Sequence, residues 1–197
     1  MLSIRKLTTY NLQPTTKNMK IHIIGIGLIG GSMALDIQTH YSDAVIFGID
    51  SNKNHLEEAI KLGIIHKTAT INDLHQADIV IVAVPVDVCL QLLPEVLDHI
   101  GKDTVVFDVG STKFPICEWV ANHPNRSNFM ATHPIAGTEF SGPSAAVNGL
   151  FNGKTNIICE VEKTTFKLQE KALELFQKIG MRIRYMNPKS HNKHIAY

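Results

Sequence analysis

The chain has 197 residues, enough for one sizeable hydrophobic core, and 19 Lys/Arg against 18 Asp/Glu. This near-neutral charge gives no indication of a nucleic-acid partner. No apolar run approaches the roughly 20 residues of a membrane-spanning helix, so we expect no membrane association. Its three cysteines are widely spaced and fit neither a disulfide framework nor a metal site, which predicts a cytoplasmic location and no bound metal.

Residues 1–18 form a leader without hydrophobic periodicity. The segment carries Arg5 and Lys6, several Ser and Thr residues and no acidic residue. We expect a disordered leader, with Met19 as a second start; a transit peptide would have the same composition. The segment lacks the apolar stretch of a secretory signal.

Residues 20–32, KIHIIGIGLIGGS, predict a buried strand, a tight glycine turn and the start of a helix. In this pattern Gly25 allows the sharp turn, Gly27 lets a pyrophosphate approach the backbone, and Gly30 lets the helix pack closely on the strand. The helix then offers unpaired N–H groups to phosphate. A glycine turn that binds nothing is the alternative. The residues assigned to the cofactor here are Gly25, Gly27, Leu28, Ile29 and Gly30.

A second apolar strand over 44–49 ends in Asp50, twenty positions after Gly30. An acidic residue at this distance binds the adenosine ribose hydroxyls in dinucleotide-binding folds. The carboxylate would repel a 2′-phosphate, so NAD is favoured over NADP, although Lys53 could soften that preference. The alternative is that Asp50 caps the following helix over 52–62.

The remaining chain alternates helices and strands, which predicts an α/β fold with a doubly wound, mostly parallel sheet, a Rossmann-like dinucleotide-binding domain over 19–187. A Gly-, Ser- and Pro-rich loop spans 140–153, with one helical turn over 145–150. Strands are expected over 64–70, 78–84, 104–108, 128–132, 156–160 and 181–186, and helices over 54–62, 72–76, 86–100, 114–122, 164–179 and from 188 onward.

Four features of this pattern follow strands and therefore meet at the carboxyl edge of the predicted sheet, where such folds bind ligands. They are the glycine turn and the segments 83–85, 110–113 and 133–139. In the second of these, Ala83, Val84 and Pro85 offer backbone and apolar contacts to the nicotinamide side. We therefore expect a nicotinamide site at this edge.

Histidine suits the role of base in an alcohol dehydrogenase because its free pKa lies near neutrality. The position of His133 at the end of a predicted strand fits this role. It could equally be a capping residue at a strand end. Ser111 could hydrogen-bond a neighbour or be the N-cap of the next helix. Lys113 could bind a carboxylate or phosphate or be solvated, and Glu139 could polarise the site or simply start a turn.

The motifs GIGLIGGS, VAVPV, DVGSTK, HPIAGTE and HNKHIAY together resemble the prephenate dehydrogenase (TyrA) family of tyrosine biosynthesis. HPIAGTE after DVGSTK is the specific part. The resemblance implies an enzyme that catalyses the NAD-dependent oxidative decarboxylation of prephenate to 4-hydroxyphenylpyruvate. It implies that His133 bonds the ring hydroxyl of prephenate, that Ser111 orients His133, and that Thr138 and Glu139 line the substrate side.

Family members continue from HNKHIAY into a helical domain that completes the substrate pocket and pairs two subunits. We therefore expect 188–197 to begin that domain's connecting helix, the chain to bind NAD but turn over poorly, and the full-length enzyme to be a homodimer. His191 and His194 lie at this join, and Asn192 replaces the usual aspartate. Arogenate as substrate, a β-hydroxyacid dehydrogenase, an imine reductase and a nucleotide-binding module without catalysis remain as alternatives.

Overall fold

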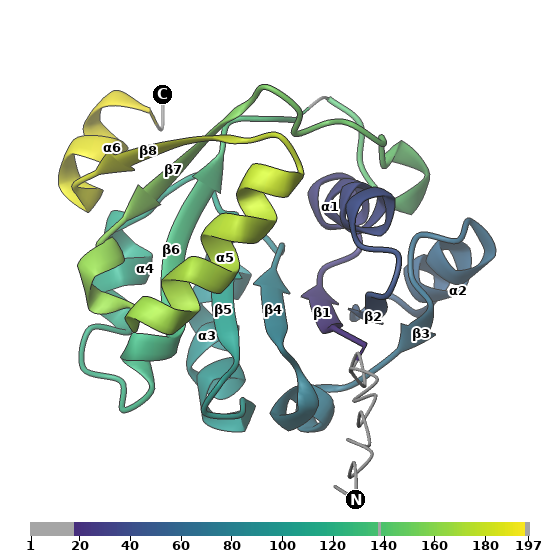
Figure 1. Ribbon diagram of the computed structural model, residues 1–197, viewed down its shortest axis with the longest axis horizontal. Coiled ribbons are helices and arrows are strands. Elements are labelled where there is room, and N and C mark those ends of the chain that lie inside the picture. Colours follow the sequence, from purple (N-terminus) through teal and green to yellow (C-terminus); the bar gives the residue numbers. More distant parts are fainter. Residues whose placement is uncertain (1–17, 138, 196–197) are drawn as a thin grey trace, which may run out of the picture.

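Eight strands form one sheet in the computed structural model, which describes residues 18–137 and 139–195 (Figure 1). The strands are β1 Lys20–Ile24, β2 Val45–Ile49, β3 Lys67–Thr68, β4 Ile79–Val82, β5 Val105–Asp108, β6 Phe129–Pro134, β7 Thr155–Cys159 and β8 Arg182–Met186. The α-helices are α1 Leu28–His40, α2 Lys53–Lys61, α3 Val86–His99, α4 Phe114–Trp119, α5 Phe166–Lys178 and α6 Pro188–His194. The 3-10 helices are η1 Ile71–Gln76, η2 Arg126–Asn128, η3 Pro143–Ala145 and η4 Val161–Lys163.

The strand order is β3-β2-β1-β4-β5-β6-β7-β8. The first six strands in this order are parallel, β7 runs antiparallel to β6, and β8 runs parallel to β7. The order 3-2-1-4-5-6 is that of the doubly wound dinucleotide-binding fold, so the predicted fold class is confirmed. Strand order reverses between β1 and β4, which places the ligand-binding crevice beyond their carboxyl ends.

Helices cover both faces of the sheet because successive strand residues point to opposite sides. Ile79 and Ile81 of β4 pack with α1 and α5 on one face, whereas Val80 and Val82 pack with α3 and α4 on the other. Figure 1 shows α5 and α1 in front of the strands and α3 and α4 behind them. The central strands β1, β4 and β5 are almost continuously apolar because both of their faces are buried.

Two predicted boundaries were wrong near the site. β6 extends to Pro134 rather than stopping at 132, because antiparallel β7 pairs with it opposite His133 and Pro134. This pairing places His133 within the strand. The predicted helix over 114–122 ends at Trp119, where residues 120–122 turn toward Pro124, a residue that disfavours helix before it.

The loop after β6 does not form the helical turn expected over 145–150, because its backbone N–H groups bond to α1 instead. The Ser32 hydroxyl accepts the N–H of Val147, and the buried Asp36 carboxylate accepts those of Gly149 and Phe151. The loop is thus strapped to the helix that follows the glycine turn.

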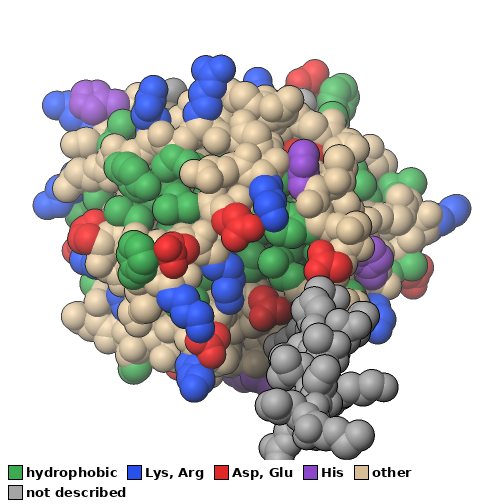
Figure 2. Space-filling view, viewed as in Figure 1, with side chains coloured by type: hydrophobic (Ala, Val, Ile, Leu, Met, Phe, Trp, Pro, Cys, Tyr) green, Lys and Arg blue, Asp and Glu red, His purple; other side chains and the backbone are tan. Residues whose placement is uncertain are grey.

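The surface carries charged side chains of both signs, and the cysteines form no disulfide in the described residues. On the face drawn in Figure 2, Lys and Arg side chains are interspersed with Asp and Glu side chains. The three cysteines are free and buried. Within residues 18–137 and 139–195, no helix is long and apolar enough to cross a membrane. The predicted leader lies outside the described residues, apart from its last one.

Candidate functional site

The glycine turn between β1 and α1 has the geometry that its sequence predicts. Gly25 has a φ of 90°, and a Cβ there would overlap the carbonyl oxygen of Ala83 on the neighbouring crossover. A Cβ on Gly30 would overlap the Gly25 carbonyl, which fixes how closely α1 packs on the turn. A Cβ on Gly27, in contrast, would meet nothing within 4 Å, so open space lies over this residue at the start of α1.

Asp50 follows β2 and faces the glycine turn. Its Oδ2 accepts the backbone N–H of Ile26 at 2.9 Å, and its Oδ1 accepts that of Asn52 at 2.8 Å. The N-cap of α2 is Asn52, whose side chain accepts the N–H of Asn54, so the alternative reading of Asp50 as the helix cap was wrong. The Asp50 carboxylate thus lies against the first residues of the turn, where a ribose would be placed.

A cavity of about 610 Å³ opens beside this carboxylate. Its floor is the glycine turn and the end of β2, and its wall is the segment after β4 together with α3. The residues that line it include Gly25, Gly27, Asp50, Ala83, Val84, Pro85, Val88 and Leu92. Apolar side chains on one wall and a carboxylate with open backbone on the other fit a flat base joined to a ribose and phosphates. These residues therefore fit a dinucleotide.

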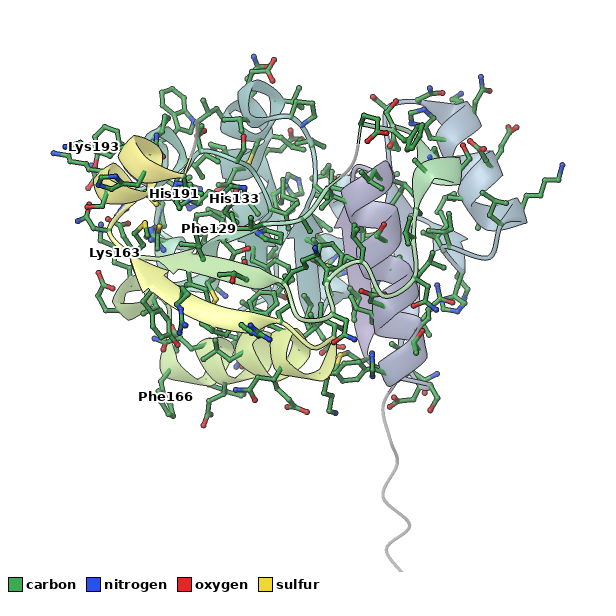
Figure 3. The ribbon with its side chains drawn as sticks, turned by 90° about the horizontal axis from the view of Figure 1, so that it is seen from above. Phe129, His133, Lys163, Phe166, His191 and Lys193 are labelled. Atoms are coloured by element: carbon green, nitrogen blue, oxygen red, sulfur yellow. The ribbon has the colours of Figure 1, made fainter. Side chains whose placement is uncertain are left out.

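His133 lies on β6 with its ring half-buried on the α4 side of the sheet. Its Nδ1 is 2.8 Å from Nε2 of His191 on α6. Figure 3 shows the two rings next to each other. Burial, the nearby Lys113 ammonium and His191 lower the pKa of His133 to about 4. The imidazole is therefore neutral at pH 7, as a proton acceptor must be.

Lys113 is fully buried, which contradicts both its expected contact with substrate and its alternative as a solvated residue. Its ammonium donates to the carboxylate of Asp108 at the end of β5 and, at 2.6 Å, to the carbonyl of Thr132. Asp108 also accepts the backbone N–H groups of Gly110 and Thr132. Lys113 thus neutralises a carboxylate inside the fold and joins β5 to β6 beneath His133.

The other predicted site residues stand apart from the His133 ring. Ser111 is exposed, and within residues 18–137 and 139–195 it makes no hydrogen bond to His133; its expected orienting role stays a prediction. Ser111 is not the N-cap of α4, because that position belongs to Lys113. Glu139 is exposed beside the loop strapped to α1. Thr138 lies outside the described residues.

Two residues that the sequence did not assign to the site meet the predicted ones. His191 is fully buried against His133, and the Oδ1 atom of Asn192 accepts the N–H groups of Lys113 and Phe114. Asn187 caps α6 and Pro188 begins it, a local signal for a helix start. That signal predicts the helix but not which of its histidines faces inward. In the described part of the chain, no group of three or more His, Cys, Asp or Glu could hold a metal ion.

Comparison with known proteins gives one family and several relatives. The family described as "Prephenate dehydrogenase, nucleotide-binding domain" matches residues 33–185. The prephenate dehydrogenase of Bacillus subtilis is 34% identical over 177 residues, which are 87% of this chain and 47% of that protein. The cyclohexadienyl dehydrogenase of Zymomonas mobilis is 28% identical over 179 residues, 89% of this chain and 61% of that protein.

Solved structures show the same similarity. A prephenate dehydrogenase from Aquifex aeolicus, crystallised with hydroxyphenyl propionate and NAD+, superimposes with a TM-score of 0.83 at 28% identity, covering 90% of this chain and 63% of that one. An arogenate dehydrogenase from Synechocystis has a TM-score of 0.81 at 25% identity, covering 89% and 62%. The chain spans about half the length of the Bacillus relative.

Proposed function

Because the chain belongs to the family of prephenate dehydrogenase nucleotide-binding domains, we propose that it binds NAD and supplies the base for the oxidative decarboxylation of prephenate. One observation carries the proposal more than any other. A neutral histidine, His133, lies at the carboxyl edge of a sheet whose switch point holds a cavity fitted to a dinucleotide. The geometry and the family support the same reaction class, a dehydrogenation.

Different residues of the chain bind different parts of the cofactor. The open backbone at Gly27 and the first N–H groups of α1 receive the pyrophosphate, since these groups have no intrahelical partner. Asp50 accepts the ribose hydroxyls through the lone pairs that its two backbone bonds leave free. When bound, NAD supplies the acceptor for the hydride that leaves the carbinol carbon.

His133 takes up and returns the proton of the hydroxyl on that carbon. As the hydride leaves, Nε2 of His133 takes the proton of the ring hydroxyl, which leaves a ring carbonyl. When the ring carboxylate departs as CO2, the electrons of the broken C–C bond make the ring aromatic, and the resulting phenolate oxygen takes the proton back from Nε2. Aromatisation supplies the driving force, so the protein mainly positions groups. Lys113 lowers the basicity of His133 through its positive charge but does not touch the substrate, because it is buried.

Formation of NADH from prephenate and NAD by the native protein that carries this chain tests the proposal. Because the pKa of His133 is lowered to about 4, we expect kcat/KM to be flat around neutral pH and to fall only as the pH approaches 4. An acid limb near pH 6.5 would contradict the environment assigned to His133. Activity with arogenate but not with prephenate would support the proposed type of reaction and correct its substrate. Activity with neither compound would overturn the proposed function.

Substitution of Gly27 separates cofactor binding from folding. Gly27 has φ −93° and ψ −158°, which any residue adopts, and its Cβ would meet no neighbour. We expect Gly27→Ala to retain the stability of the wild type but to bind NAD at least about tenfold more weakly, equal to about 1.4 kcal/mol. Calorimetric titration and thermal unfolding measure the two quantities.

The matched variant Gly30→Ala should behave in the opposite way. Its Cβ would overlap the Gly25 carbonyl, so the loss appears in stability even without NAD. Unchanged NAD affinity in Gly27→Ala would show that the pyrophosphate does not lie against the backbone of Gly27.

A further inference from the structure

The amide of Asn192 has a fixed orientation. Its Oδ1 lies 2.8 Å from the backbone N of Lys113 and 3.2 Å from that of Phe114. Both backbone groups are donors at the start of α4, so the atom that faces them must be the oxygen. Asn192 on α6 therefore caps α4 from another helix, and its Oδ1 is a fixed acceptor.

This fixed acceptor determines the tautomer of His191. The Nδ1 of His191 is 3.2 Å from Oδ1 of Asn192, and it must donate because the oxygen cannot. Burial lowers the pKa of His191, so its ring is neutral and carries a single N–H. With Nδ1 protonated, Nε2 of His191 is a bare acceptor.

The tautomer of His133 follows from that of His191. Nε2 of His191 lies 2.8 Å from Nδ1 of His133, the rings cross at 66°, and His191 is fully buried. His133 must donate its Nδ1–H to the bare Nε2. The remaining nitrogen of His133, Nε2, then carries a lone pair. This is the nitrogen that the proposed reaction needs unprotonated.

We propose that His191, anchored by Asn192, is a positioning residue that holds His133 in the Nδ1–H tautomer and so presents a bare Nε2 to the substrate hydroxyl. This inference rests on the proposed function for its catalytic meaning, whereas the tautomer itself is a property of the protein alone. A free histidine ring favours the opposite tautomer, so the chain of bonds reverses an intrinsic preference.

The charges around the pair explain why the chain of bonds ends in an amide. The Lys113 ammonium disfavours a positive charge on either ring, and the Asp108 carboxylate favours one on His191, but Lys113 and Asp108 are paired with each other. Asn192 adds no charge and cannot accept a proton. A proton passed to His191 could therefore go no further, so the proton that His133 takes up has to leave through its own Nε2.

Nitrogen-15 NMR of histidine-labelled protein at pH 7 to 8 measures the tautomer without NAD or substrate. We expect His133 and His191 both to show a protonated Nδ1 and a bare Nε2. A protonated Nε2 on His133 in the wild type would overturn the inference, and no variant is needed for that result.

Two variants of His191 then separate positioning from packing. His191→Leu fills the buried position with an apolar side chain and removes the acceptor, so His133 should shift toward the Nε2–H tautomer. His191→Gln can place its amide oxygen against Nδ1 of His133 and should restore the wild-type tautomer. An unchanged His133 tautomer in a folded His191→Leu variant would also overturn the inference.

The kinetic constants of the variants and the pH dependence of their activity test the same inference in the native protein. In the native protein, His191→Leu should lower kcat about tenfold with little change in KM, and His191→Gln should recover most of the loss. Asn192→Asp keeps the capping oxygen but adds a negative charge, so the acid limb of the pH profile should move up by about one unit. No movement in Asn192→Asp would contradict the coupling through His191. If the tautomers agree but prephenate is not oxidised, the proposed function fails while this inference stands.

Discussion

Replacement of His133 with alanine is expected to lower kcat for NADH formation by about 10²- to 10⁴-fold, the usual effect of losing a general base. NAD affinity should remain that of the wild type, because the glycine turn and Asp50 lie on other strands. The measurement is steady-state NADH formation in the native protein, run beside a calorimetric titration of NAD. His40→Ala is the matched control, since this histidine is exposed at the far end of α1 and should leave both quantities unchanged.

The paired readout makes this prediction decisive. Full activity in His133→Ala would remove the base from the proposed mechanism. Loss of NAD binding together with activity would mean that the variant disturbs the fold or that His133 holds the cofactor. Only loss of turnover with retained NAD binding agrees with His133 as the base.

Substitution of Lys113 with methionine should lower the free energy of unfolding by about 3–5 kcal/mol, the usual cost of removing one partner of a buried ion pair. Methionine fills much of the same space, but it leaves the Asp108 carboxylate in the core without its cation. Denaturant unfolding at pH 7 measures this loss. The pKa of His133 should also rise, because the Lys113 ammonium is one cause of its lowering.

Lys167→Met is the control for the loss of a lysine ion pair at the surface. Lys167 pairs with Asp103, and both side chains are mostly exposed, so the unfolding free energy should change little. A Lys113→Met variant as stable as the wild type would contradict the burial of this lysine. It would also reopen the substrate contact that the sequence predicted.

The cofactor half of the molecule could be predicted from the sequence because its signals are local. The turn from Gly25 to Gly30 and the strand that ends at Asp50 are short contiguous patterns, and each glycine has the steric reason that the pattern assigns to it. The apolar run of β4 likewise requires burial on both faces. Local patterns of this kind specify a parallel sheet and its switch point.

The surroundings of His133 depend on contacts between distant segments, which no local pattern contains. His191 meets His133 across 58 residues, and Asn192 meets Lys113 across 79. A lysine between Thr112 and Phe114 gives no local sign of burial. Its one signal is Asp108, a carboxylate that ends a buried strand and therefore needs a partner.

The loop after β6 differed from expectation for the same reason. Its Gly- and Ser-rich sequence indicates an irregular segment, but only the fold shows that Ser32 and Asp36 of α1 receive its N–H groups. Gly31 contributes as well, because a Cβ there would press on Ala146 of the loop. The residues just after the glycine turn thus hold the loop after β6 in place.

Calorimetric titration of this chain with NAD, and with NADP in parallel, measures whether the glycine turn and Asp50 form an NAD site. We expect one NAD site per chain and at least about tenfold weaker binding of NADP, equal to about 1.4 kcal/mol, because the Asp50 carboxylate faces the position of the 2′-phosphate. Absence of NAD binding, or tighter binding of NADP, would contradict the assignment of the glycine turn and Asp50 as the NAD site.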